Sequence, residues 1–117
     1  MADTSHSASN ALDWEGTYKG IVPCADCEGI QTTITLNKNL TYVLTTVYLG
    51  KENDAESELN GKFFWNADGL KIVLEGIENA PNQYFVGENK LFQLDMKGNR
   101  ITGNLAKNYQ LQKVNQL

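Results

Sequence analysis

The segment Ile21–Ile30, with the sequence IVPCADCEGI, holds the two cysteines of the chain, Cys24 and Cys27, separated by two residues. Two sulfur atoms at this spacing can do three kinds of chemistry. They can act as a thiol–disulfide redox couple, bind a metal ion, or form a disulfide that fixes the loop. The choice depends on the secondary structure on either side of the pair and on the other ligands that the chain offers.

Redox catalysis is the least favoured of the three. Catalysts of the thioredoxin type place the cysteine pair at a helix N-terminus, where the helix dipole lowers the pKa of the thiol. Here the flanking residues have the pattern of strands, and the acidic Asp26 and Glu28 lie beside the cysteines. Negative charge raises the pKa of a thiol and so disfavours the reactive thiolate.

Metal binding at Cys24 and Cys27 is a second alternative. A structural zinc site needs four ligands, usually from a second cysteine pair or a histidine pair, and this chain has only one histidine, His6. Two thiolates alone suit Cu(I), a soft ion that accepts few ligands. Met96, a further soft ligand, is far away in the sequence. Cu(I) is therefore the metal considered for Cys24 and Cys27, with no third ligand near them in the sequence to support it.

A disulfide between Cys24 and Cys27 is the third alternative. Closing a four-residue loop stabilises a protein by roughly 2 kcal/mol in the chain-entropy treatment, so such a bond shapes its loop more than it supports the fold. If strained, it is also comparatively easy to reduce and can report on its surroundings. The residue types alone leave these alternatives open.

The segments that position the cysteines alternate in polarity, which is typical of half-buried strands. Trp14, Tyr18 and Val22 share one face before the pair, and Ile30, Ile34 and Leu36 share one face after it. Turn signals separate further segments of this kind, and the one helix candidate, at 105–113, has too few apolar residues. We expect nine short strands, at 14–22, 30–37, 40–49, 59–65, 70–77, 82–87, 90–95, 101–105 and 109–114. Closing such a meander removes its exposed edges, so we predict an all-β fold, a small antiparallel up-and-down β-barrel.

Size and charge limit the remaining possibilities. At 117 residues with 41% hydrophobic content, the chain predicts one domain at 14–117, preceded by a polar, flexible tether at 1–13. The net charge is −4 and the basic residues are scattered, which argues against a nucleic-acid partner. No stretch reaches the ~18 apolar residues of a membrane span, and no signal peptide is recognisable.

The segment WEGTYKGIVPCADCEGIQTTITL resembles the N-terminal domain of the NlpE family of bacterial outer-membrane lipoproteins, which are linked to copper resistance and envelope-stress sensing. The resemblance implies a location in the bacterial cell envelope, a lipocalin-like barrel, and Cys24 and Cys27 as the CxxC of the family. It also implies membrane attachment only through a lipidated cysteine ahead of the tether, which this chain does not contain. Two-domain members carry an OB-like domain after the barrel, whereas this sequence stops at Leu117.

Other features offer little support for catalysis. The body of the domain has no histidine to act as a base, no G-x-S-x-G and no phosphate loop, so we expect a non-enzymatic protein. The leading hypothesis is a domain that senses or buffers envelope stress, including copper, through its CxxC loop, with an envelope signalling protein as a partner. The alternative is a barrel that binds an apolar or lipid-like ligand, with a purely structural disulfide. Aromatic side chains could line such a cavity or simply fill the core: Tyr18, Tyr42, Tyr48, Phe63, Tyr84, Phe85 and Phe92.

Overall fold

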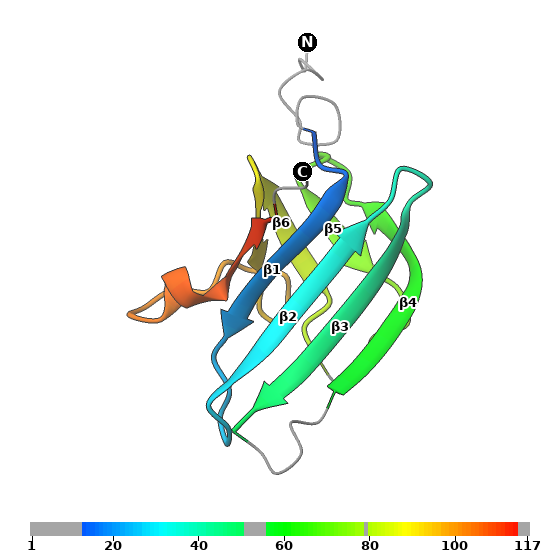
Figure 1. Cartoon of the computed structure of the whole chain (residues 1–117). Helices are drawn as coiled ribbons and strands as arrows, with labels where there is room; N and C mark the ends of the chain where they lie inside the picture. Colours follow the sequence, from blue (N-terminus) through cyan, green and yellow to red (C-terminus); the bar gives the residue numbers. More distant parts are fainter. Residues whose placement is uncertain (1–12, 51–55, 79, 115–117) are drawn as a thin grey trace.

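The protein is a closed barrel of eight antiparallel strands in up-and-down order, seen in a computed structural model that describes residues 13–50, 56–78 and 80–114 (Figure 1). Each strand pairs with the next one along the chain, and the last strand pairs with the first. The prediction of an all-β up-and-down barrel is confirmed. The strands are β1 (Gly16–Val22), β2 (Gly29–Leu36), β3 (Thr41–Leu49), β4 (Glu56–Trp65), β5 (Lys71–Leu74), β6 (Gln83–Gly87), β7 (Lys90–Gln93) and β8 (Gln110–Lys113).

The predicted strand at 101–105 is wrong. These residues form bends and turns, in which Gly103 has a φ of 100°, a conformation that an extended strand does not contain. A short 3₁₀-helix, η2 (Ala106–Tyr109), follows them and leads into β8. The predicted tether at 1–13 lies outside the described residues except for Asp13. In the described part of the chain, no helix is long and apolar enough to cross a bilayer.

The tight turns lie where the sequence predicted them. Gly69, in the Asp-Gly turn between β4 and β5, has a φ of 70°, and Asn89 between β6 and β7 has a φ of 62°. In the turn between β2 and β3, Leu40 takes the left-handed conformation with a φ of 66°. These residues reverse the chain in few steps, which lets neighbouring strands pair directly.

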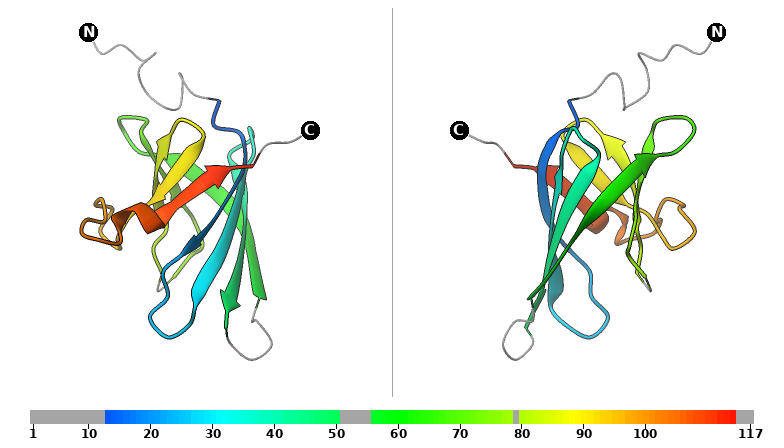
Figure 2. Two further views of the ribbon diagram at one scale, coloured as in Figure 1. Left: turned by 60° about the vertical axis from the view of Figure 1, so that its left-hand side comes forward. Right: turned by 90° about the vertical axis from the view of Figure 1, so that its right-hand side faces the viewer.

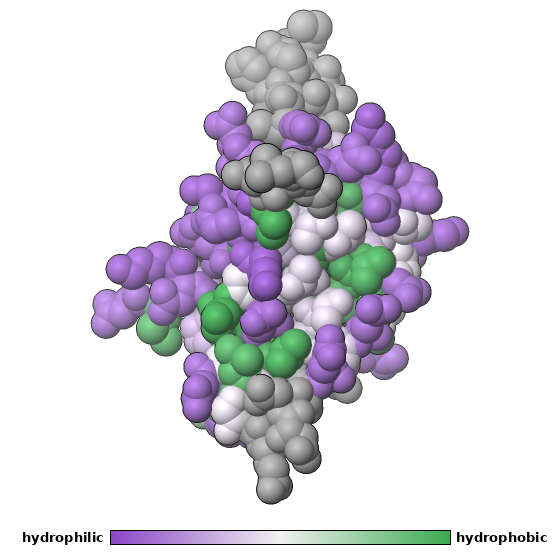
Figure 3. Space-filling model, in the orientation of Figure 1, coloured by the Kyte–Doolittle hydropathy of each residue, from purple (hydrophilic) through white to green (hydrophobic). Residues whose placement is uncertain are grey.

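Alternating side chains fill the barrel. Residues of β1, β2 and β3 at even positions point inward, and threonines dominate the outer face of β2. Figure 3 shows the outer face of β1–β3 as pale and polar surface with separate apolar patches. The packed interior is apolar and makes the barrel a filled core rather than a pore. Its members are Tyr18, Val22, Ile34, Leu36, Tyr42, Leu44, Phe63, Ile72, Leu74, Tyr84, Val86, Leu91 and Leu111.

The two ends of the barrel differ because the strands have unequal lengths. Strands β1–β4 have seven to ten residues, whereas β5–β8 have four or five. Pairing between β4 and β5 covers only Phe63–Trp65, so the first part of β4 extends beyond its neighbour (Figure 2). At one end, Trp14, Phe63 and Trp65 pack edge to face with ring centroids 5.7–6.5 Å apart. The opposite end, where β1 leads into β2, is the open end.

Candidate functional site

The cysteine pair lies at the open end, in the loop between β1 and β2. Pairing of these strands runs from Gly16 opposite Leu36 to Val22 opposite Ile30, so the loop begins directly after the last strand pair. The backbone N–H of Glu28 donates to the carbonyl of Leu49 at 3.1 Å, which attaches the loop to the end of β3. The loop is therefore held by its flanking strands β1 and β2 and also by the end of β3.

Cys24 and Cys27 are joined by a disulfide, with an S–S distance of 2.10 Å and Cα atoms 5.3 Å apart. Both cysteines are half-buried, and Asp26 between them is exposed. The Cys24 sulfur lies 3.5 Å from Oδ1 of Asp26, and the Cys27 sulfur lies 3.3 Å from the carbonyl oxygen of Gly29. Both sulfur atoms thus have an oxygen neighbour and remain near solvent.

These residues also form a possible ligand set for a metal ion. Among the described residues, one group of three His, Cys, Asp or Glu side chains is close enough to hold a metal ion. Its members are Cys24, Asp26 and Cys27, and their ligand atoms all lie within 4.8 Å of one another. The disulfide form offers no thiolate, because both sulfurs are used in the bond. Only the reduced loop combines two soft sulfur ligands with a carboxylate. Met96 is 60% exposed and belongs to a cavity wall rather than to this group.

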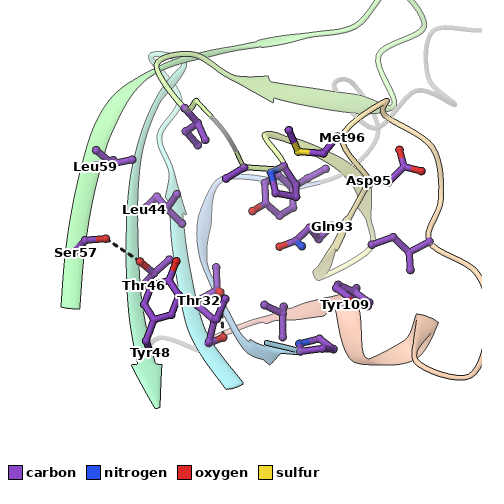
Figure 4. A pocket seen from close by; sticks show the side chains of 18 of the residues that line it. Thr32, Leu44, Thr46, Tyr48, Ser57, Leu59, Gln93, Asp95, Met96 and Tyr109 are labelled. Atoms are coloured by element: carbon purple, nitrogen blue, oxygen red, sulfur yellow. Dashed lines mark hydrogen bonds between the residues drawn. The ribbon is translucent and has the colours of Figure 1, made fainter. Parts of the chain in front are cut away.

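A cavity of about 510 Å³, the mouth cavity, opens at the same end of the barrel (Figure 4). One wall is the inner face of the long strands, and the other is formed mainly by the segments after β5 and β7 and by Tyr109 at the end of η2. Val22 and Pro23 line it just before Cys24, so the disulfide loop borders the cavity. A separate groove includes Cys24 itself with Leu105 and Asn108.

The aromatic residues singled out in the sequence divide into three groups. Tyr18, Tyr42 and Phe63 fill the core. Tyr84 belongs to the core and also lines the mouth cavity, and Tyr48 lines the cavity alone. Phe85 and Phe92 instead pack together outside the core, with centroids 6.0 Å apart, and the Arg100 guanidinium lies 5.0 Å and 4.6 Å from their rings. Strand parity explains this, since Phe85 is opposite Phe92 and the flanking Tyr84 and Val86 face inward.

Burial changes the acidity of the inward tyrosines. Desolvation and, secondarily, the Asp13 carboxylate raise the pKa of Tyr18 to about 12. Its hydroxyl donates to the carbonyl of Trp14 at 2.7 Å. Burial also raises the pKa of Tyr84, and burial followed by the charge of Glu75 raises that of Tyr42. These hydroxyls therefore remain protonated at neutral pH.

Sequence reasoning did not identify most residues of the mouth cavity. Strand alternation could place Thr32, Leu44 and Thr46 on the inner face, but it could not show that their opposing strand ends early. The facing wall comes from irregular segments that carry no periodic signal. It includes Ile77, Glu78, Pro81, Asp95 and Ile101.

Comparison with known proteins places this barrel among lipoproteins. The family model of the NlpE N-terminal domain matches residues 18–104. Lipoprotein NlpE of Escherichia coli strain K12 is 36% identical over 86 residues, which are 73% of this chain but 36% of that protein. The chain thus spans only about a third of that relative, whose activity as a whole protein is not carried over by the match.

Two crystal structures are similar to the barrel. A putative lipoprotein from Shewanella oneidensis has a TM-score of 0.84 and 48% identity, with 92% of this chain and 95% of that chain covered. The Cpx pathway activator NlpE from Escherichia coli has a TM-score of 0.62 and 33% identity, with 76% and 46% covered. Sequence and structure agree with the resemblance first seen around the cysteines. The chain belongs to the NlpE family, and residues 18–104 correspond to its N-terminal domain.

Proposed function

We propose that this domain is the non-enzymatic part of a bacterial outer-membrane lipoprotein that senses or buffers copper and envelope stress through its Cys24–Cys27 loop. The observation that carries the proposal is the grouping of two cysteine sulfurs and the Asp26 carboxylate, all within 4.8 Å, in a half-buried loop between two strands. A pair placed in this way can change between two states without unfolding the barrel behind it.

The chemistry of the loop depends on its redox state. Reduction of the disulfide by an external dithiol adds two electrons and two protons and yields two thiols on a loop held by β1, β2 and β3. One Cu(I) can then replace both thiol protons and be bound by Cys24 and Cys27 as thiolates. The two sulfurs would select Cu(I), because thiolate is a soft ligand. Asp26 offers a hard oxygen ligand and so contributes mainly negative charge near the ion.

The relatives support this assignment in part. The Escherichia coli protein is described as an activator of the Cpx pathway, and we extend to this chain the idea of an envelope signalling protein as its partner. The cysteines lie on a strand-to-strand loop rather than at a helix N-terminus, which favours a sensor or a buffer over a thiol catalyst. We further propose that a lipid anchor attaches the protein to the membrane.

A Cu(I) titration against a competing chelator tests the proposal. We expect the reduced domain to withdraw one equivalent of Cu(I), and the oxidised domain and the Cys24→Ser/Cys27→Ser variant to withdraw none. Ala25→Ser is the matched control, because it places a serine in the same loop and leaves both sulfurs in place. Equal affinity in the reduced wild type and the double serine variant would remove copper from the proposed function.

A further inference from the structure

We propose that the mouth cavity binds a single-chain amphiphile, with its hydrocarbon chain in the cavity and a positively charged nitrogen at the rim. The cavity volume of about 510 Å³ lies within the ~300–1,000 Å³ typical of small-molecule sites. Mouths of barrels are among the places where such sites occur. This inference concerns a different site from the cysteine loop and does not depend on copper binding.

The cavity exists because strands β1–β4 are longer than strands β5–β8. Past the last pair between β4 and β5, at Phe63 and Leu74, β4 has no neighbouring strand on that side. Loop residues such as Ile77 and Ile101 form the opposite wall at this level instead. The result is a half-open space between a sheet and loops rather than a flat apolar face. This shape suits one flexible chain better than the surface of a folded partner.

The inner part of the cavity is apolar where a hydrocarbon chain would lie. Val22 and Leu44 are buried, and Tyr84 is only 2% exposed. Figure 4 shows Leu44 and Thr46 on the strands, with Gln93 and Tyr109 across the cavity. Three hydroxyls of the strand wall already have partners, since the Thr46 and Ser57 hydroxyls bond to each other at 2.9 Å and Thr32 donates to the Ile30 carbonyl. An apolar chain can therefore cover these groups without leaving them unpaired.

The charge at the rim selects the head group. The charged side chains among the described residues that line the cavity are Glu78 and Asp95, and both are acidic. Asp95 also accepts hydrogen bonds from the backbone N–H groups of Lys97 and Asn99, which fixes its position. The rings of Tyr48 and Tyr109 lie on opposite walls and can contact a cationic nitrogen through their faces (Figure 4). A free carboxylate at the same place would be repelled.

The test uses the whole 117-residue chain and three probes with the same twelve-carbon chain, each kept below its micelle concentration. Dodecylphosphocholine, dodecyltrimethylammonium and dodecanoate are titrated while backbone amide shifts are followed by NMR. We expect saturable shifts at Thr32, Leu44 and Tyr84 with a nitrogen-bearing probe, and dodecanoate weaker by about tenfold or more. Binding of both nitrogen-bearing probes would identify the cationic nitrogen as sufficient, and binding of dodecylphosphocholine alone would point to lysophospholipids.

Two variants make the test specific to the cavity. Ser57→Trp fills the mouth from β4 and should weaken dodecylphosphocholine binding by about tenfold or more. Glu58→Trp adds the same side chain to the opposite face of the strand and should leave binding unchanged. Glu78→Gln, at an exposed loop position, should weaken dodecyltrimethylammonium by about threefold and leave dodecanoate no weaker. The absence of saturable shifts, equal binding of dodecanoate, or equal effects of the two tryptophans would overturn the proposal.

Discussion

The Asp26 carboxylate lies 3.5 Å from the sulfur of Cys24, in the loop between β1 and β2. Negative charge at this distance disfavours a thiolate on Cys24 once the disulfide is reduced. We therefore expect Asp26→Asn to speed alkylation of the reduced loop at neutral pH by about twofold to tenfold, measured by mass spectrometry after short exposure to iodoacetamide. Asp68→Asn, in a turn at the other end of the barrel, is the control. An unchanged rate in Asp26→Asn would show that the carboxylate does not influence the thiol.

The disulfide should contribute modestly to the stability of the barrel. Strands β1 and β2 pair along their whole length, from Gly16 to Val22, without help from the loop. We expect Cys24→Ser/Cys27→Ser to lower the free energy of unfolding by about 2 kcal/mol, with the fold retained. Urea denaturation and the far-UV circular dichroism spectrum measure the two quantities. Loss of the folded state would mean that the loop supports the barrel.

Two glycines with similar settings should differ in their tolerance of a side chain. A Cβ at Gly20 would lie 2.6 Å from the Gln110 carbonyl oxygen, a backbone atom where β1 meets β8. A Cβ at Gly29 would meet the tip of Ile21, a side chain that is 55% exposed and able to turn aside. We expect Gly20→Ala to cost about 1–3 kcal/mol and Gly29→Ala less than about 1 kcal/mol in urea denaturation. Equal costs would contradict the close packing at β8.

Buried tyrosines should make the fold sensitive to alkali. The pKa of Tyr18 is raised from its ordinary value of 10.0 to about 12, so below pH 10 the residue is neutral whether the chain is folded or unfolded. As the pH rises above 10, the unfolded chain loses this proton first, and the free energy of unfolding falls until the folded pKa near 12 is passed. Denaturation at about pH 9 and about pH 11 measures the loss.

Tyr18→Phe provides the comparison for that measurement. The variant loses the hydrogen bond to Trp14 and so starts about 1 kcal/mol less stable at pH 9. Its further loss between the two pH values should be smaller than that of the wild type, because one titrating group is gone. It should not vanish, since burial also raises the pKa of Tyr42 and Tyr84. An identical loss in both proteins would exclude Tyr18 as a contributor.

Much of the fold could be predicted from local chemistry. The alternation at Tyr18 and Val22, and the positive-φ turns at Gly69 and Asn89, depend only on neighbouring residues, and they identified β1 and two of the hairpins. The segment 101–105 was wrongly predicted as a strand because two of its five residues are apolar. It forms no strand because Gly103 has a positive φ and the segment has no partner strand in the described part of the chain, where a single bridge joins Leu94 to Arg100 just before it. Likewise, the residues next to Phe85 and Phe92 in the sequence do not indicate that the Arg100 guanidinium lies over both rings.

The candidate sites show the same division. The spacing of Cys24 and Cys27 alone indicated a disulfide, a metal site or a redox pair, because only two residues separate the two cysteines. The mouth cavity arises from the difference in length between strands far apart in the sequence, such as β4 and β7. Such a difference becomes visible only when the strands are arranged in the barrel.

The ligands of copper in the reduced domain test the central proposal most directly. X-ray absorption at the copper edge should be recorded on the reduced chain loaded with one equivalent of Cu(I). The proposal predicts a first shell that contains both sulfur atoms, of Cys24 and Cys27, and its loss in the Cys24→Ser/Cys27→Ser variant. A shell of nitrogen and oxygen alone, or the same spectrum from the wild type and the variant, would contradict it.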